Sequence, residues 1–298
     1  MSPSKVVIVR GPGVLSADGA INAPVLGRIY ERGLRLLTGA SGGTDTLASI
    51  FAPADRAGIK INGIAGRRLT TPPDVALPLA RLLVRAGLKA RNIVVWDRTN
   101  RELKEAGFRL NAAGEDFRIM GTDTAGMGYG GELLEHRSIG SRFSAIQTDF
   151  ITASISLAVL KDHGLAGVTA GMKNYFGAIH NPNKYHDDHG DPYVAELFDA
   201  PAIKGRHRLT VIDALQVQYH KGPSFHAAWA DRREALIFSL DPVAADFAGW
   251  QIIENLRRAK GLPTLAEEER PPAYIKTAER LGLGRATPGD IQIIEDTV

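Results

Sequence analysis

Short apolar runs typical of buried strands recur along this chain, and helix-length segments lie between them. Val6–Val9 is a continuous β-branched run, and GIKIN (58–62) and IVVWD (93–97) follow it. A run of about four to eight apolar residues is typical of a strand buried on both faces. Because strands and helices alternate, the chain is predicted to adopt an α/β fold with a largely parallel sheet flanked by helices.

Several of the helices between these runs have recognisable ends. Asn22 is expected to cap one helix, and Asp241, with a proline after it, another. Pro72 and Pro73 fit a third helix start. Asp246 falls on an apolar helical face, so it is expected to be buried and paired. The remaining expected elements are helices at 100–107 and 273–281 and strands within 150–160 and at 209–213, 235–240 and 291–294.

Polar residues stand at or just after the ends of several expected strands. Asn62 and Asp97 close two of them, Lys161 and His163 follow a third, and Asp213 closes LTVID. Ligands of open α/β sheets bind beyond the carboxyl ends of the strands, so these residues are predicted to line one crevice. For any single aspartate, a helix cap or turn former is the simpler interpretation.

The stretch at 159–192 combines a glycine-rich turn with Lys173 and a histidine-rich loop. Lys173 has small and apolar neighbours in the sequence, and burial there would lower its pKa and make it a nucleophile or base. Imidazole is a ligand for divalent transition metals, so the histidines of this loop, His186 and His189 among them, are candidate ligands. A solvated polar loop is the alternative for these histidines.

A second polar loop follows GIKIN. It contains Arg67, Arg68, Thr70 and Thr71 beside glycines, ahead of the proline-initiated helix, and Lys60 lies just before it within GIKIN. Backbone N–H groups and a helix N-terminus favour phosphate or carboxylate binding. The alternative is a basic surface loop, and there is no Walker pattern.

Two short motifs fail their structural context. Gly39–Gly43 matches G-x-S-x-G, but a helix-like segment rather than a strand precedes Ser41, so a glycine helix end and turn is the better interpretation. Gly126–Gly131 matches G-x-G-x-x-G without a clear strand before it or a helix after it. We expect a flexible lid there rather than a dinucleotide site.

Composition limits the class of partner. The net charge is only +3, basic residues are scattered and aromatics make up 7%, so nucleic-acid binding is not expected. The chain has no cysteine, which excludes a cysteine-ligated iron–sulfur cluster. No apolar run is long enough to span a membrane. The sequence as it stands is expected to be cytoplasmic, or exported if a signal segment was removed.

The segment LKDHGLAGVTAGMKNYFGAIHNPNKYH (160–186) closely resembles the family named domain of unknown function 362. The shared pattern is Lys161-x-His163, a small-residue turn, Lys173-Asn174-x-x-Gly and a downstream histidine. GIKIN, TTP at Thr70–Pro72, LTVIDAL and DPVAADFAG fit as well, so the resemblance covers nearly the whole chain. It implies one unit over 1–298, in two lobes with the site at their cleft.

The pattern His163-x-x-Ala-Gly-x-Thr-x-Gly-x-Lys173 resembles, more distantly, the nickel-pincer lactate racemases. In that family the histidine is an acid/base, and the lysine is covalently tethered to a nickel-carrying pyridinium nucleotide. The resemblance implies a metal-ligating role for His186 or His189. Asp97 stands near the place of the racemases' other catalytic histidine, so racemisation of a 2-hydroxy acid does not simply carry over.

Together these patterns predict an enzyme that acts on a small carboxylate or phosphate, racemase-like or oxidoreductase-like. The candidate catalytic residues are His163, Lys173 and Asp97. Nickel, another divalent metal or a nucleotide is the candidate cofactor. The candidate ligand-binding residues are Lys60, Asn62, Arg68, Thr70, Thr71, Lys161, Asn174 and Asp213. The alternatives are a non-catalytic metal- or anion-binding protein and, last, a G-x-S-x-G hydrolase.

Overall fold

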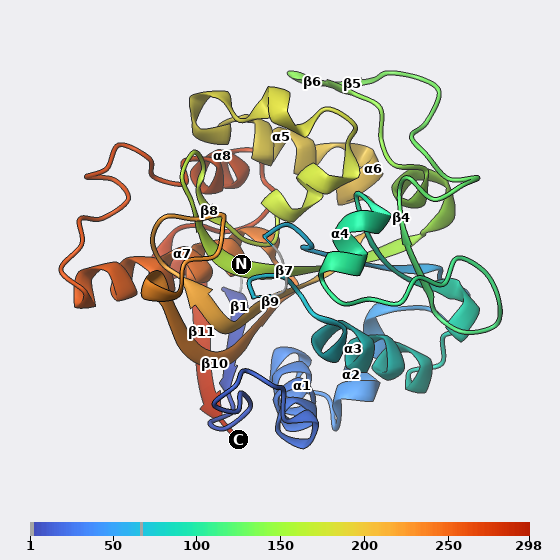
Figure 1. Ribbon diagram of the computed structural model, residues 1–298, viewed down its shortest axis with the longest axis horizontal. Coiled ribbons are helices and arrows are strands. Elements are labelled where there is room, and N and C mark those ends of the chain that lie inside the picture. Colours follow the sequence, from blue (N-terminus) through green and yellow to red (C-terminus); the bar gives the residue numbers. More distant parts are fainter. Residues whose placement is uncertain (1–2, 66–67) are drawn as a thin grey trace.

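A twisted sheet runs through the middle of the protein, and helices cover both of its faces (Figure 1). The computed structural model describes residues 3–65 and 68–298. Within that part of the chain, nine strands form one sheet in the order β11-β1-β10-β9-β7-β2-β3-β4, with β8 paired to β7. The pairs from β9 to β4 and the β1–β11 pair are parallel, so the α/β prediction is confirmed.

The strands of this sheet differ greatly in length. They are β1 (Ser4–Arg10), β2 (Ala57–Ile61), β3 (Ile93–Asp97), β4 (Arg118–Gly121), β7 (Ala153–His163), β8 (Gly167–Thr169), β9 (His207–Gln218), β10 (Ala230–Ser239) and β11 (Ile291–Thr297). A separate hairpin consists of β5 (Leu134–His136) and β6 (Ile139–Ser141). The two longest strands, β7 and β9, lie next to each other at the centre.

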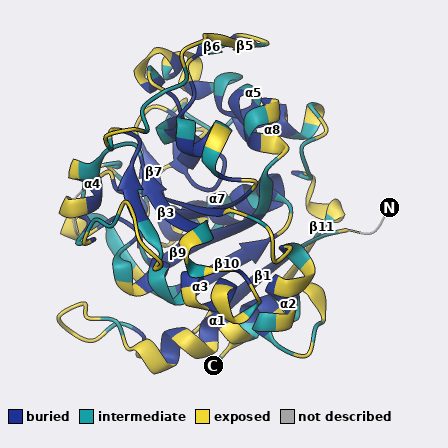
Figure 2. Cartoon of the chain, turned by 90° about the vertical axis from the view of Figure 1, so that its right-hand side faces the viewer, coloured by how far each residue is buried: buried dark blue, intermediate teal, exposed yellow. Residues whose placement is uncertain are grey.

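The helices form two layers, one on each face of the sheet. Their bounds are α1 (Ala23–Thr38), α2 (Gly43–Ile50), α3 (Pro73–Arg85), α4 (Asn100–Glu105), α5 (Tyr193–Asp199), α6 (Pro201–Lys204), α7 (Pro242–Ala259) and α8 (Tyr274–Arg280). One core lies between the sheet and α1, α2 and α3, and the other between the sheet and α5, α7 and α8. Figure 2 shows the buried sheet between these two partly exposed layers.

Helix ends follow the expected chemistry. The Asn22 side chain accepts a hydrogen bond from the N–H of Val25, and Asp241 accepts from two N–H groups of the first turn of α7. Gly39 ends α1 in the left-handed conformation, at φ 78°. Because Ser41 lies between two helices and bonds to Asp45, the nucleophile-elbow geometry is absent from this segment.

The central strands extend further than their apolar runs predict. Apolar character stops near Leu160 and at Asp213, but β7 continues to His163 and β9 to Gln218. All of β7 is buried, including its polar last residues. The expected strand ends were therefore wrong for β7 and β9, and right for β3.

Among residues 3–65 and 68–298, none of the helices has both the length and the apolar character needed to span a membrane.

Candidate functional site

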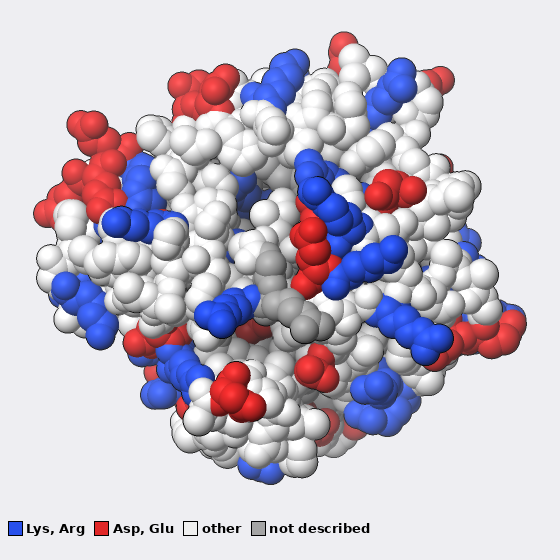
Figure 3. Space-filling model, in the orientation of Figure 1, with Lys and Arg blue, Asp and Glu red and all other residues white. Residues whose placement is uncertain are grey.

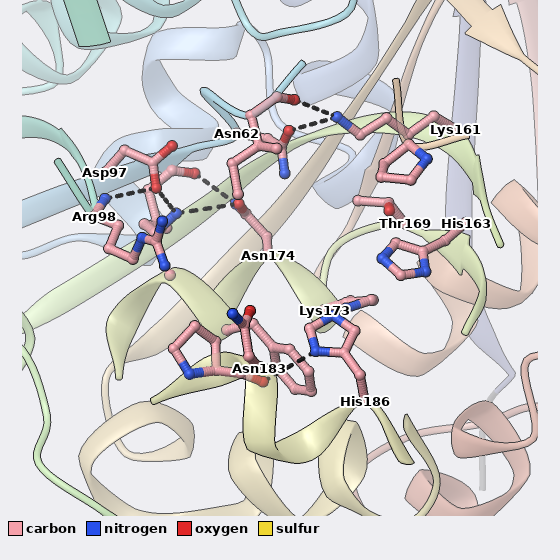
Figure 4. Close-up of a pocket in the computed structure, with 16 residues that line it drawn as sticks. Asn62, Asp97, Arg98, Lys161, His163, Thr169, Lys173, Asn174, Asn183 and His186 are labelled. Atoms are coloured by element: carbon pink, nitrogen blue, oxygen red, sulfur yellow. Dashed lines mark hydrogen bonds and ion pairs between the residues drawn. The ribbon is translucent and has the colours of Figure 1, made fainter. Parts of the chain in front are cut away.

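A polar pocket of about 220 Å³ lies at the carboxyl ends of β2, β3 and β7. This is where a parallel sheet presents its ligand site. Asn62, Asp97, Lys161, His163 and Lys173 all line the pocket, so five side chains from four separate segments come together. Figure 4 shows Asp97 and Arg98 on one side and His163, Lys173 and His186 on the other.

The Asp97 carboxylate accepts hydrogen bonds through both of its oxygen atoms. The Lys60 Nζ atom donates to Asp97 Oδ1 at 2.5 Å, to the Ile61 carbonyl at 2.7 Å and to Asn174 Oδ1 at 3.3 Å. The other carboxylate oxygen of Asp97 accepts from the Gly63 N–H at 2.6 Å. Asn174 also donates to the Lys60 carbonyl. These groups hold one another, and Asp97 lacks a free oxygen for acid–base work.

Lys161 occupies the floor of the pocket inside a ring of oxygen atoms. Its Nζ atom donates to Asn62 Oδ1 at 2.9 Å, to the Ile64 carbonyl at 2.6 Å and to the Leu69 carbonyl at 3.2 Å. Burial lowers the pKa of Lys161 to about 7, although the charge of Asp97 opposes that shift. The lysine therefore ties β7 to the loop after β2 and places a titratable amine at the pocket.

His163 is held in one tautomer by the turn that follows it. Its Nδ1 atom accepts hydrogen bonds from the Leu165 N–H at 3.2 Å and the Ala166 N–H at 3.1 Å. A nitrogen that accepts two N–H bonds carries no hydrogen, so the hydrogen of the neutral ring is on Nε2. Burial, followed by the charges of Lys173 and His186, lowers the pKa of His163 to about 2. This histidine is a hydrogen-bond donor at neutral pH and not a base.

Lys173 is buried and faces a second imidazole. Its Nζ atom lies 3.0 Å from His186 Nε2, while His186 Nδ1 donates to the Pro182 carbonyl at 3.0 Å. Because Nδ1 carries the hydrogen of His186, Nε2 accepts from the lysine. Burial lowers the pKa of Lys173 to about 7, and the charge of Lys161 adds to that shift. The His163 and His186 rings stack at 5.4 Å.

The backbone before Lys173 is anchored by α7, which packs on the same face of the sheet. Asp246 of α7 is fully buried and accepts from the N–H groups of Gly171 at 2.7 Å and Met172 at 3.1 Å. Tyr274 donates to the same carboxylate. The expectation that Asp246 is buried and paired is confirmed, and its partners are neutral donors rather than a charge.

The pocket carries an excess of positive charge. Lys60, Lys161, Lys173 and Arg98 line it, against Asp97 as its only described carboxylate. Basic side chains also gather around the hollow on this face of the protein in Figure 3. Phe176 and Pro182 supply apolar wall. Such a lining suits a small anion whose remaining atoms are largely apolar.

Three candidate residues lie elsewhere. Asp213, Arg68 and Thr70 line a different pocket, so the prediction that Asp213 shares the crevice with His163 was wrong. Asp213 is in the middle of β9, because that strand continues for five residues after it, to Gln218. Arg67 is outside the residues that the structure describes.

Two further candidates have structural contacts instead of a place in the pocket. The Thr71 hydroxyl donates to the Leu157 carbonyl at 3.1 Å. The exposed His189 bonds through Nδ1 to the Leu165 carbonyl and does not line the pocket that contains His186.

Three polar lining residues were not among the candidates, namely Arg98, Thr169 and Asn183. Arg98 follows Asp97 directly at a strand end, and the same strand-end argument would have included it. Thr169 is part of the motif between His163 and Lys173. Asn183 had no signal of its own, because its position depends on the irregular turn at Pro182–Tyr185.

Comparison with known proteins places the chain in a family. The model of the family described as Domain of unknown function (DUF362) matches residues 58–251, and the chain belongs to this family. No curated protein matches the sequence.

Two solved structures resemble the fold. The lactate racemase apoprotein from Thermoanaerobacterium thermosaccharolyticum has 14% identity and a TM-score of 0.48, with 84% of this chain and 57% of that chain covered. A Thermotoga maritima protein has 13% identity and a TM-score of 0.45, with 80% and 59% covered. This chain thus spans less than two thirds of the length of each.

The donor atoms in the pocket do not fit a metal centre held by protein side chains alone. His163 Nε2 carries a hydrogen and has no lone pair for a metal, and His186 Nε2 is bonded to Lys173. Across residues 3–65 and 68–298, no three His, Cys, Asp or Glu side chains gather as a possible metal site. We therefore derive no chemical step through nickel, another metal or a metal-carrying nucleotide.

Proposed function

We propose that the pocket is the active site of an enzyme that moves a proton at a carbon atom next to the carboxylate or carbonyl of a small anionic substrate. The single observation that carries the proposal is the contact of Lys173 with a neutral, oriented His186 inside a cationic pocket. That arrangement supports an amine base beside a place for an anion. Lys161 and Arg98 supply charge for the anionic group.

Lys173 has the properties of the base. With a pKa of about 7 it is partly unprotonated at neutral pH. Its neutral amine donates one N–H to His186 Nε2 and keeps a lone pair for a substrate proton. The same amine is also a nucleophile toward a carbonyl, and a Lys173→Arg variant separates a lysine-specific role from anion binding, since arginine retains only the charge.

His163 has the properties of the hydrogen-bond donor that stabilises the product of proton abstraction. Removal of a proton next to a carboxylate or carbonyl places negative charge on oxygen. A neutral imidazole with its hydrogen fixed on Nε2 donates to that oxygen, and no reorganisation is needed because Nδ1 is already bonded to the turn. Asp97 positions Lys60 and Asn174 in this mechanism.

The test is exchange of substrate hydrogen with solvent. Small 2-hydroxy and 2-oxo carboxylates, and their phosphorylated analogues, are incubated with the protein in D₂O and followed by proton NMR. The breaking C–H bond gives its proton to Lys173 Nζ, and a deuteron returns to the carbon. We expect exchange with at least one compound and its loss in Lys173→Arg, while the exposed His189→Gln variant retains it.

A non-catalytic anion-binding role is the second candidate, and the same cationic lining favours it. It predicts calorimetric binding of such an anion to wild type and to Lys173→Arg, with no exchange in either protein. Binding without exchange across the whole panel would contradict the proposed enzyme.

A further inference from the structure

A second cavity, of about 360 Å³, lies on the other side of the segment at 68–72. Its lining shares no residue with the pocket around Lys173. The floor comes from Val159 of β7 and from Asp213 and Leu215 of β9, on the sheet face that packs against α1 and α3. The loop between β1 and α1 closes one side through Leu15 and Ile21.

Two buried polar side chains that line this cavity each have an oxygen atom without a hydrogen-bond partner in the described part of the chain. Asp213 is 5% exposed; its Oδ1 atom accepts from the Leu215 N–H at 2.9 Å, and no group in the described part of the chain donates to Oδ2. Thr70 is also 5% exposed, and its hydroxyl has no hydrogen-bond partner within the described residues. A buried polar group without a partner costs free energy, and a ligand group that bonds to it removes that cost.

An arginine with no acidic partner among the described residues stands at the same cavity. The Arg68 guanidinium lies over the Phe225 ring, 5.5 Å from its centroid. Neither Asp213 nor Asp18 forms an ion pair with it in residues 3–65 and 68–298. A guanidinium stacked on a ring keeps its edge N–H groups available for a carboxylate.

Four charged residues line the cavity, and two of them, Asp18 and Arg232, bond to the loop at 16–20. The other two, Asp213 and Arg68, supply one acid and one guanidinium for a ligand, beside several apolar side chains. A ligand that satisfies both charges without adding net charge must carry a cation and an anion of its own. Apolar residues of the lining leave room between them for a hydrocarbon side chain. They are Leu15, Ile21, Leu69, Val159, Leu215 and Phe225.

We propose that this second cavity binds a free amino acid with an apolar side chain. Its carboxylate pairs with the Arg68 guanidinium, and its ammonium group donates to Asp213 Oδ2 and to the Thr70 hydroxyl. The side chain packs against Leu15, Ile21 and Phe225. This site is separate from the proposed chemistry at Lys173, and neither depends on the other.

The test uses three small molecules that differ in one charge at a time. L-Leucine carries both charges, 4-methylpentanoate lacks the ammonium, and 3-methylbutylamine lacks the carboxylate. Each is titrated into the full chain by calorimetry, above the pH of about 7 to which burial raises the pKa of Asp213. We expect leucine to bind at least about tenfold more tightly than either analogue, since each omitted charge leaves a buried or stacked partner unpaired.

Variants locate the binding. Asp213→Asn keeps the shape and the acceptor for the Leu215 N–H but removes the charge, and it is expected to weaken leucine binding by about tenfold or more. Lys173→Gln, in the other pocket, is the matched control and is expected to bind leucine as wild type does. Equal affinity for leucine and 4-methylpentanoate, unchanged affinity in Asp213→Asn, or no leucine binding at a concentration of several millimolar would each overturn the proposal. If Asp213→Asn does not fold, the comparison of the three ligands on wild type still decides.

Discussion

Two buried lysines govern how the first pocket responds to pH. Burial lowers the pKa values of both Lys161 and Lys173 to about 7. In the proposed reaction Lys173 has to lose its proton to act as a base, so we expect activity to rise as pH increases through about 7. Lys161 has to keep its proton to attract the anion, so activity falls over the same range. The two lysines interact, and the profile therefore belongs to the pair.

We accordingly expect a narrow, bell-shaped dependence of kcat/KM on pH with its maximum near 7, measured on whichever substrate shows exchange. Lys161→Met removes the falling limb and raises KM. A profile that stays flat between pH about 6 and about 9 would mean that neither lysine titrates during turnover.

Asp246 is the residue on which the turn before Lys173 most directly depends. Asp246→Ala leaves the N–H groups of Gly171 and Met172 buried without an acceptor, at a cost of about 1–3 kcal/mol each in unfolding free energy. Urea denaturation of wild type and variant measures this difference. Lys276→Ala, at an exposed position of α8, serves as the control. Equal stability of Asp246→Ala and wild type would show that water replaces the carboxylate.

The polar residues at the expected strand ends show why the prediction of one shared crevice was only partly successful. Asn62 and Asp97 were placed correctly because their strands are short and end where their apolar runs end. Asp213 follows an equally good apolar run, but β9 continues because its neighbours Leu215 and Val217 are again buried. An isolated acid inside a long strand has the same local pattern as one at the strand end, and only the three-dimensional pairing distinguishes them.

At the level of elements, the short turn from Lys173 to Ala178 positions both sides of the first pocket. Gly177 is the residue that lets this turn approach the Lys60–Asp97 pair. A Cβ atom at Gly177 would lie 2.8 Å from Lys60 Nζ and 2.9 Å from Asp97 Oδ1. The family pattern Lys-Asn-x-x-Gly therefore has a steric reason at its last position.

Gly177→Ala is expected to displace Lys60 and weaken anion binding several-fold, with the fold kept, because real Cβ contacts do not come this close. Calorimetric titration with the best-binding carboxylate measures the effect. Gly140→Ala is the matched control, since no atom lies within 4 Å of a Cβ placed there. Equal anion affinity in the two variants would contradict a close approach at Gly177.

Element pairing also shows where the sequence was insufficient. The parallel half of the sheet follows from strands joined by helices, which the periodicity revealed. The antiparallel pairing of β9 with β10 was not predicted from this periodicity, because a loop with only a short 3-10 turn at Ala227–Trp229 joins the two strands. The metal assignment rested on a family resemblance for His186 and on a separation of three residues for His189. Neither can show that His186 bonds to Lys173 and His189 to the Leu165 carbonyl.

Across the whole molecule, a buried ion network connects the central strand to the segment before α8. Asp162, on β7 beside His163, pairs with Arg270 at 2.6 Å, and Arg257 of α7 pairs with Glu268 at 2.5 Å. Arg270 also donates to the His163 carbonyl at 3.3 Å. The network thus supports the strand from which two of the pocket's side chains extend.

Arg270→Ala leaves Asp162, whose side chain is 1% exposed, without its closest cation, and is expected to lower the unfolding free energy by about 3–5 kcal/mol. Arg91→Ala is the control: its pair with Glu115 is largely exposed and is expected to change stability by less than about 1 kcal/mol. Thermal and urea unfolding measure both. A loss no larger than in the control would mean that Arg257, 3.9 Å from Asp162, is sufficient on its own.

The position of β1 in the sheet has a consequence for how the chain folds during synthesis. β1 leaves the ribosome before the other strands of this sheet, yet its partners are β10 on one side and β11 on the other. Neither exists until the ribosome has passed residue 230. The apolar segment Val6–Val9 therefore remains unpaired while the β2–β3 part of the sheet is synthesised. We expect a chaperone that shields extended apolar segments to bind the nascent chain at β1.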